Sequence, residues 1–331
     1  MARQLSHKPG AKGVPMKPDV IMSRTVALAE GLKGKPERGS EEGAPVRLID
    51  FLCTAFAPVK RTTVKAWLKY GQVKANGTIS TQFDLPLHSG SVVEVNTSRP
   101  WQTLSHPRLK LVYEDDDIIV VNKGYGLLSV ASDNNKAMTA YSIVRDYLKR
   151  VNPSNKLFIV HRLDQHTSGL MMFAKNIETK EAMQHNWNNM VLDRRYAAIV
   201  EGYVEPREGI IDTLLAENSR HVVYVPGDDP ESESQERPAE TKRAVTRYTM
   251  VKSRNGYSLL DVSLDTGRKN QIRVHMQHIG HPIAGDRKYG AKTSPVHRLC
   301  LHARTLRFVH PTTRRDMNFE IPLPTSFGRL V

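Results

Sequence analysis

The sequence predicts an α+β protein, in which a large domain built on a largely antiparallel mixed sheet with flanking helices follows a small α/β domain. Three observations predict this fold class. At 331 residues the chain is long enough for two domains. In its second half, segments with the pattern of strands outnumber segments with helical spacing. These strands and helices do not alternate regularly, which disfavours a parallel α/β sheet.

The charge and the cysteine content narrow the class of partner and compartment. Lys and Arg number 48 against 34 acidic residues, a net charge of +14 with a pI near 9.7. This excess favours a polyanionic partner, either a nucleic acid or an anionic membrane surface. No apolar run approaches the length of a membrane span, so we expect no membrane insertion. Cys53 and Cys300 lie far apart, which argues against a disulfide framework and favours the cytoplasm.

Residues 1–45 are rich in Gly, Pro, Lys and Ser and have little periodic apolar content. They predict a disordered basic tail. Up to Arg24 the basic residues face only Asp19, a bias that mitochondrial transit peptides share. Mitochondrial import therefore remains an alternative to a cytoplasmic location.

Residues 46–98 predict a compact small domain. VRLIDFLCTAF and KRTTVKAWLKYG both have apolar residues at helical spacing, and QVKANGTI and SVVEV read as strands. Gly71 suits a left-handed helix end, and the Asn-Gly pair suits a tight hairpin turn. The basic residues of the second helix, Arg61, Lys65 and Lys69, could contact phosphates. The alternative is that they only solvate a helix face.

The pattern of this small domain resembles an RNA-binding domain named after the fourth protein of the small ribosomal subunit. The likeness lies in an Arg-Leu-x-x-Phe-Leu helix, a second helix that starts with Lys-Arg, and Gly-x-Val-x-x-Asn-Gly. The family usually has Gly-Asp before its last strand, where this chain has Gly90-Ser91. The resemblance implies that Arg61, Lys65 and Lys69 bind RNA.

A linker at 99–107, with Pro100 and Pro107, leads to the large domain at 108–331. Its predicted helices lie in DNNKAMTAYSIVRDYLKRV, from about 177 to 190, and in NQIRVHMQHIG. Its clearest predicted strands are DIIVV, DRRYAAIVEGYV, and the antiparallel pair RAVTRYTMV and YSLLDVSLDTG. Residues 226–243, rich in Pro, Asp, Glu and Ser, predict a surface insertion.

One carboxylate stands out in this domain. Asp164, in IVHRLDQHTSGLMMFAKN, lies in a turn between two apolar runs. It could be an ordinary turn former. Alternatively, burial would raise its pKa, and a nearby arginine would reverse this and favour the carboxylate. A lone charged, partly dehydrated oxygen suits a nucleophile or base acting at a sugar, in a reaction that needs no second acid.

Other site chemistries are not indicated. The sequence has no Gly-rich phosphate loop of either standard kind and no Gly-x-Ser-x-Gly elbow. His275, His278 and His281 recur at three-residue intervals but have no nearby cysteine or helix-facing carboxylate. We therefore expect polar packing or RNA contact at these histidines and no metal.

HRLDQHTSGLMMFAK resembles the central motif of the RluA-type family of RNA pseudouridine synthases, His-Arg-Leu-Asp-x-x-Thr-Ser-Gly-Leu followed by apolar residues and Ala-Lys. Three further segments resemble the family's other motifs in order and spacing: DDDIIVVNKGYGLL, RRYAAIVEG and TGRKNQIRVHMQHIGHPIAGDRKYG. The first has Lys-Gly-Tyr-Gly in place of Lys-Pro-x-Gly. The last has Lys269-Asn270 where Thr or Ser followed by His is usual. The resemblance covers nearly everything from residue 108 onward.

The resemblance implies a role for each matching residue. Asp164 would be the catalytic carboxylate, which attacks the anomeric carbon of a uridine or removes a ribose proton. Arg273 would pair with Asp164 and keep it ionised. Tyr196 would pack against the target base and could help to remove the proton from carbon-5. Arg162 would fill the gap left by the extruded nucleotide or hold its phosphate. Thr167 and Ser168 would shape the turn and contact the substrate.

The implied function is isomerisation of uridines in structured RNA, without a cofactor and by a monomer. Large-subunit ribosomal RNA is favoured as the substrate and transfer RNA is the alternative, both on family analogy. A non-catalytic RNA-binding or ribosome-assembly factor is the first rival. A hydrolase such as an RNA glycosylase is the second, although the motif lacks the second carboxylate that such an enzyme would use.

Overall fold

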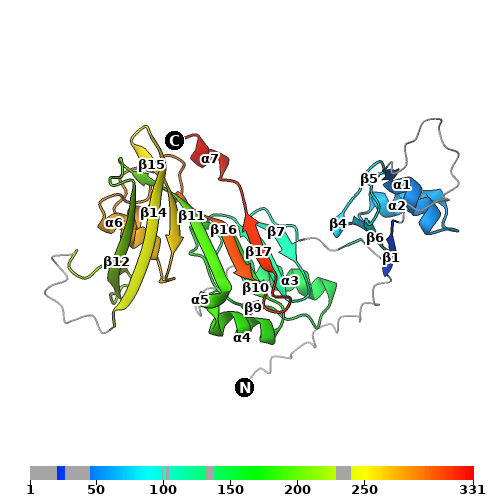
Figure 1. Cartoon of the computed structure of the whole chain (residues 1–331), viewed down its shortest axis with the longest axis horizontal. Helices are drawn as coiled ribbons and strands as arrows, with labels where there is room; N and C mark the ends of the chain where they lie inside the picture. The colour runs from blue at the N-terminus through cyan, green and yellow to red at the C-terminus, as the bar shows by residue number, and fades with distance from the viewer. Residues whose placement is uncertain (1–20, 27–44, 99, 102–103, 132–137, 229–239) are drawn as a thin grey trace, which may run out of the picture. The chain divides into compact units, whose positions relative to one another are not determined.

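The computed structural model describes residues 21–26, 45–98, 100–101, 104–131, 138–228 and 240–331. The chain divides into two compact units, Met1–Gln102 and Thr103–Val331 (Figure 1). The boundary between the units falls inside the segment that the sequence predicts as a linker. Among the described helices, none combines the length and the apolar character needed to cross a membrane.

The small unit packs two helices against a short antiparallel sheet. Helices α1 (Leu48–Ala55) and α2 (Arg61–Lys69) bury the apolar faces predicted from their spacing. The sheet has the order β1 (Ile21–Thr25), β6 (Val92–Asn96), β3 (Val73–Ala75) and β4 (Thr78–Ile79), and β2 (Val46–Arg47) pairs separately with β5 (Pro86–Leu87). The Asn76-Gly77 pair has positive φ at both residues, as the predicted hairpin turn requires.

Strand β1 corrects the prediction of a disordered tail up to residue 45. Residues 21–25 pair antiparallel with the whole of β6, and Val26 is buried in the core of the unit. Without this partner, the outer edge of β6 would leave a row of unpaired N–H and C=O groups. The rest of the predicted tail, residues 1–20 and 27–44, lies outside the described residues, as does 229–239, the larger part of the predicted insertion.

The large unit is built on one mixed sheet, which confirms the predicted α+β fold class. In its described residues the sheet has eleven strands, and the main order is β13-β12-β14-β15-β11-β16-β10-β8-β7. All pairs are antiparallel except that of β10 with β16. The strands are β7 (Leu109–Glu114), β8 (Ile118–Lys123), β9 (Phe158–Ile159), β10 (Ser168–Ala174), β11 (Val191–Glu201), β12 (Glu208–Glu217), β13 (Val223–Tyr224), β14 (Lys242–Arg254), β15 (Tyr257–Leu264), β16 (Leu301–Val309) and β17 (Asp316–Glu320).

Helices flank this sheet along its length (Figure 1). They are α3 (Ala140–Val151), α4 (Ile177–His185), α5 (Trp187–Met190), α6 (Gln271–His278), the short 3-10 helix η2 (Arg287–Tyr289) and α7 (Thr325–Gly328). The helix predicted from 177 to 190 is interrupted at Asn186, which caps the end of α4 and precedes α5. Strand β8 is buried on both faces, because Ile119 packs in the cluster that includes α3 residues and Ile118 packs in the cluster that includes Met183 of α4. This burial explains its unbroken apolar run.

The parallel pairing of β10 with β16 is short and forms a seam in the sheet. It joins Ser168 to His302 and Gly169 to Ala303, after which β17 takes over as the neighbour of β16. Gly169 has φ +121°, and a Cβ there would lie 2.1 Å from the carbonyl oxygen of Ala303. Only glycine fits such a close approach. The seam fixes the start of β10, immediately after the turn that carries Asp164.

Candidate active site

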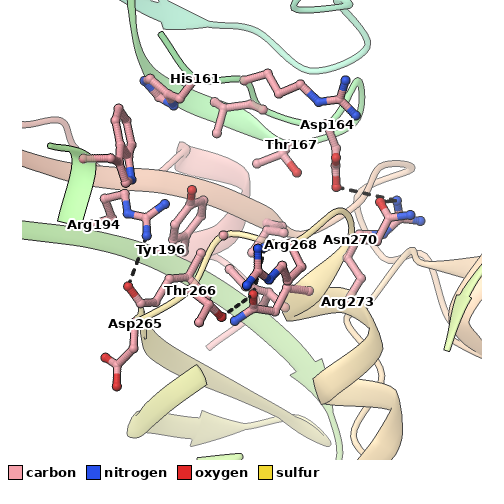
Figure 2. Close-up of a pocket in the computed structure, with 18 of the residues that line it drawn as sticks. His161, Asp164, Thr167, Arg194, Tyr196, Asp265, Thr266, Arg268, Asn270 and Arg273 are labelled. Carbon is pink, nitrogen blue, oxygen red and sulfur yellow. Dashed lines mark hydrogen bonds and ion pairs between the residues drawn. The ribbon is translucent and has the colours of Figure 1, made fainter. Parts of the chain in front are cut away.

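A cavity of about 530 Å³ opens in the large unit, within the size range of ligand sites. Its lining combines five parts of the chain: the turn between β9 and β10, the start of α5, strand β11, the segment from the end of β15 into α6, and the first residue of β16. Figure 2 shows Asp164 and Arg273 at one side of the cavity and Arg194 at the other. Of the residues predicted for the site in this domain, the cavity lining includes Asp164, Arg162, Thr167, Tyr196 and Arg273.

The turn that presents Asp164 is held from several sides. The backbone N–H of Thr167 donates to the carbonyl of Asp164 at 3.1 Å and closes the turn. The ammonium of Lys123, fully buried beneath it, donates to the carbonyls of Gln165 at 3.1 Å and Leu127 at 2.8 Å. These bonds fix the backbone at and after the carboxylate, so Asp164 is presented by a rigid turn.

The structure corrects the predicted role of Ser168. It belongs to the turn region but lies outside the cavity lining and is buried. Its hydroxyl is 2.8 Å from Nδ1 of His302 and accepts a hydrogen bond from Arg298 at 2.6 Å. The prediction that Ser168 contacts substrate is therefore wrong, because its hydroxyl serves the seam between β10 and β16.

Arg273 reaches Asp164, but its main partner is a second carboxylate. The guanidinium Nη1 lies 4.0 Å from Oδ2 of Asp164. Its Nε and Nη2 donate to both oxygens of Asp286 at 2.6 and 2.7 Å, and Nη1 also donates to Oδ1 of Asn270 at 3.0 Å. The side chains of Arg273 and Asp286 are 10% and 2% exposed. Such a bidentate pair fixes the plane of the guanidinium.

The pKa of Asp164 is raised, contrary to the expectation that an arginine would lower it. Partial burial raises the pKa of the carboxyl, whose side chain is 28% exposed, while the charges of Arg273, Arg162 and Lys123 oppose the rise and that of Asp286 adds to it. Arg273 does not reverse the effect of burial because it is 4.0 Å away and shares its charge with Asp286. A carboxylate that water solvates poorly is a stronger base and nucleophile than one in bulk solvent.

Tyr196 is aimed into the cavity by an irregularity in its strand. The pairing of β11 with β16 shifts register between Arg195 and Tyr196, and such bulges re-aim side chains next to active sites. Burial raises the pKa of the Tyr196 phenol, and the charge of Asp164 adds to the rise while that of Arg194 opposes it. The phenol therefore keeps its proton at neutral pH.

The cavity carries an excess of positive charge. Arg162, Arg194 and Arg268 line it, and no carboxylate of the described residues lies within 4.0 Å of any of them. Arg194 donates to the carbonyl of Leu264 at 3.3 Å, and its guanidinium lies over the ring of Trp187. Unneutralised arginines in a concave site favour an anionic ligand such as a phosphodiester.

Two groups could in principle have held a metal. The histidines of α6 and the turn after it have separate partners, because His275 contacts two threonine hydroxyls, His278 contacts Asp228, and His281 contacts the carbonyl of Glu201. Elsewhere in the described chain, Asp115, Asp117 and His310 place ligand atoms within 4.8 Å of one another. Backbone N–H groups already donate to Asp115 and His310, which fits a hydrogen-bonded cluster that holds the loops together better than a metal site.

In the small unit, the structure brings the three predicted RNA-binding residues to one groove. Arg61, Lys65 and Lys69 line a cavity of about 480 Å³ together with Arg47 and the exposed ring of Phe83. Asp50 pairs with Arg47 at 2.7 Å and with Arg61 at 3.5 Å, and it does not line the groove. Basic groups beside an exposed aromatic ring are typical of single-stranded nucleic-acid sites.

Sequence reasoning missed two residues that hold Arg273. Asp286 belongs to the quoted segment GHPIAGDRKYG, where a lone aspartate among basic residues was a usable signal. Asn270 has φ 54° at the start of α6, accepts from Arg273, and donates through Nδ2 to the hydroxyl of Tyr289 at 3.0 Å. Its signal was the departure from the usual His. Lys269, by contrast, extends to Glu217 at 2.6 Å, which does not line the cavity.

Comparisons with known proteins agree with this geometry. The family described as RNA pseudouridylate synthase matches residues 117–278. The uncharacterized RNA pseudouridine synthase YlyB of Bacillus subtilis is 33% identical over 299 residues, which cover 88% of this chain and 95% of that protein. The ribosomal large subunit pseudouridine synthase D of Haemophilus influenzae is 31% identical over 307 residues, 86% of this chain and 90% of that protein.

A solved structure shares the fold. Human RNA pseudouridylate synthase domain containing 4 superposes with a TM-score of 0.53 at 24% identity, over 66% of this chain and 92% of that one. At this identity the likeness supports the fold alone. It agrees with the mixed, largely antiparallel sheet described above.

Proposed function

Because this chain belongs to the family of RNA pseudouridine synthases, and is therefore an RNA-modifying isomerase, we propose that it converts specific uridines of structured RNA with Asp164 as its catalytic carboxylate. The observation that carries the proposal is the placement of Asp164 in a basic cavity, 4.0 Å from a guanidinium that Asp286 and Asn270 hold in place. We infer that large-subunit ribosomal RNA is the substrate. The support is that several relatives are ribosomal large subunit pseudouridine synthases D by name.

The reaction moves one bond. The glycosidic bond between the sugar and N1 of uracil breaks, the base turns, carbon-5 bonds to the sugar and loses its proton, and N1 gains a proton. No atom of water is added, so a site that excludes water suits the reaction. Asp164 would act at the sugar, either by attack on the anomeric carbon or by removal of a ribose proton. Both routes need the basic, poorly solvated carboxylate that burial produces here.

The neighbouring groups would bind and orient the nucleotide. We place Tyr196 against the uracil ring as a neutral phenol, because its raised pKa makes it a poor proton acceptor at neutral pH. Arg162 and Arg268 would hold the phosphates on either side of the extruded nucleotide. Base extrusion requires such contacts, since it must offset an unstacking energy of a few kcal/mol.

The test uses ribosomal RNA tritiated at carbon-5 of uracil. The proposed isomerase releases tritium to water while the base stays on the chain. An RNA glycosylase would release free uracil, and a non-catalytic RNA-binding protein would release nothing. A transfer-RNA substrate in parallel distinguishes the alternative RNA.

Asp164→Asn should abolish release and leave RNA binding within a few-fold, because the amide keeps the shape of the side chain and loses its basicity. The matched control is Asp265→Asn, an aspartate of the same cavity whose oxygens are already taken by Arg247. This control should keep most of its turnover. Retained turnover in Asp164→Asn would end the proposed mechanism.

The small unit would supply affinity for RNA through its groove. Joint replacement of Arg61, Lys65 and Lys69 by alanine should weaken binding and flatten its dependence on salt. Each lost phosphate contact on single-stranded RNA reduces the log–log slope by about 0.7. Filter binding at several salt concentrations measures this slope, and an unchanged slope would remove the groove from the binding surface.

A further inference from the structure

Outside the cavity, beside the turn that carries Asp164, four side chains form a column that starts in the core and ends in solvent. Phe327 is fully buried, and the guanidinium of Arg298 lies 5.1 Å from its ring centre. The same guanidinium lies 4.9 Å from the ring centre of Tyr125. The ring of His166 follows, 5.3 Å from that of Tyr125 and tilted by 39°. We call these four residues the ring column; its last member, His166, is exposed.

The exposed end of the ring column is rigid. The N–H of Gly126 donates to the carbonyl of Gln165 at 3.0 Å, and the amide of Gln165 donates back to the carbonyl of Gly126 at 3.3 Å. Lys123 donates to the same carbonyl of Gln165 from below. The turn with Tyr125 and the turn with His166 are therefore clamped together. A preformed platform loses little conformational entropy when a ligand binds to it.

The chemistry of the ring column matches that of nucleobase platforms. Histidine, tyrosine and arginine are side chains on which unpaired RNA bases stack. Arg298 has no carboxylate of the described residues within 4.0 Å, and Arg162 lies four residues before His166 on the same exposed turn. Arg162 therefore offers a positive charge on the exposed turn, where the phosphate of an RNA strand could contact it. Partial desolvation of the ring and then the charges of Arg273 and Lys123 lower the pKa of His166 against the opposing charges of Asp286 and Asp164, which favours a neutral ring.

The position of His166 indicates that a base next to the target uridine would bind there. It is two residues after Asp164 in the same turn, while Asp164 faces the cavity and His166 lies outside its lining. A nucleotide in the cavity would continue into neighbours that pass over this turn. We propose that the exposed end of the ring column is a second nucleotide subsite, which stacks an unpaired nucleobase adjacent to the target uridine. This inference rests on the proposed function, because it assigns another part of the same RNA substrate.

The test measures stacking directly and does not depend on turnover. The probes are two hairpin RNAs with one uridine in the loop, preceded in one and followed in the other by the fluorescent base 2-aminopurine. Stacking on an aromatic ring quenches this fluorescence. The full-length protein should quench one of the two probes, and His166→Ala should bind that probe about 5- to 150-fold more weakly, the fold-change expected for loss of one base–aromatic stack.

Two variants separate stacking from general damage. His166→Phe keeps a ring and should keep both quenching and affinity, whereas a role of His166 in proton transfer would not be rescued by phenylalanine. His185→Ala, at an exposed histidine of α4, should bind like the unchanged protein. Failure of the unchanged protein to quench either probe, or equal quenching by His166→Ala, would overturn the subsite. Quenching that depends on His166, together with no tritium release from the labelled ribosomal RNA, would overturn the proposed function and keep the nucleotide subsite.

Discussion

Replacement of Asp286 by asparagine tests the part of the site that the sequence did not reveal. Asp286 is 2% exposed and binds Arg273 through both oxygens. Asparagine has the same shape, but it turns an N–H group toward one of the guanidinium N–H groups and leaves a buried positive charge without its partner. Breaking one side of a buried ion pair costs about 3–5 kcal/mol. For a unit of this size, that corresponds to a fall in Tm of roughly 6–20 °C.

The same substitution should change activity in two ways. Arg273 loses its orientation toward Asp164, and a misplacement of about 1 Å can lower turnover about 100-fold. Asp286 also raises the pKa of Asp164, so its removal lowers that pKa and moves the acid limb of the kcat/KM profile to lower pH. Calorimetry measures the fall in Tm. Tritium release across a range of pH measures the loss of turnover and the shift of the acid limb.

The control is Asp212→Asn, which breaks a bidentate pair with Arg243 on the exposed face of the sheet. Exposed pairs contribute little, so its Tm should hardly change. If Asp286→Asn has the same Tm, turnover and pH profile as the unchanged protein, the claim that Asp286 positions Arg273 is wrong.

Three further substitutions test other parts of the structure. Asn270→Gly removes the amide that holds the Arg273 guanidinium and does not strain the left-handed backbone. In the tritium assay kcat should fall about tenfold with little change in KM. Asn270→Asp keeps the acceptor oxygen and should recover part of the loss. Burial lowers the pKa of Lys123 to about 7 from its ordinary value of 10.5. Between these two pH values the unfolded chain binds more protons than the folded one, so the free energy of unfolding rises with pH. Chemical denaturation across this range should show that Lys123→Met loses the rise. Gly169→Ala would place a methyl group 2.1 Å from the Ala303 carbonyl and should yield insoluble or strongly destabilised protein, whereas Gly290→Ala, with no neighbour within 4 Å, should stay soluble.

Local patterns in the sequence were sufficient where the structure is local. The Asp164 turn follows from two apolar runs separated by polar residues, and the antiparallel pair β14 and β15 follows from two adjacent strand patterns. Helix α6 follows from the spacing of Ile272 and Met276, which are both buried. In each case, hydrophobic burial on one face determines both the sequence pattern and the structure.

The features that the sequence did not reveal depend on partners far along the chain. Strand β1 has no clear alternation and exists because β6 offers an open edge more than sixty residues away. The side-chain partner of Arg273 is Asp286, which lies beyond the end of α6. Ser168 was assigned to the substrate through its place in the motif, but its hydroxyl is buried against His302 and Arg298. Spacing alone cannot say which face meets a cavity.

The seam between β10 and β16 has a consequence for how this protein can vary. Asp164 lies in the turn before β10 and Arg273 lies in α6 after β15, so their separation depends on the register of this seam as well as on the two short loops that carry them. Segments attached to the outer strands could therefore grow or shrink through evolution while the separation stays constant. A slip of one residue at Gly169 would instead turn the carboxylate away from its arginine. Tolerance to insertion should thus be high at the periphery of the sheet and absent at its narrow middle.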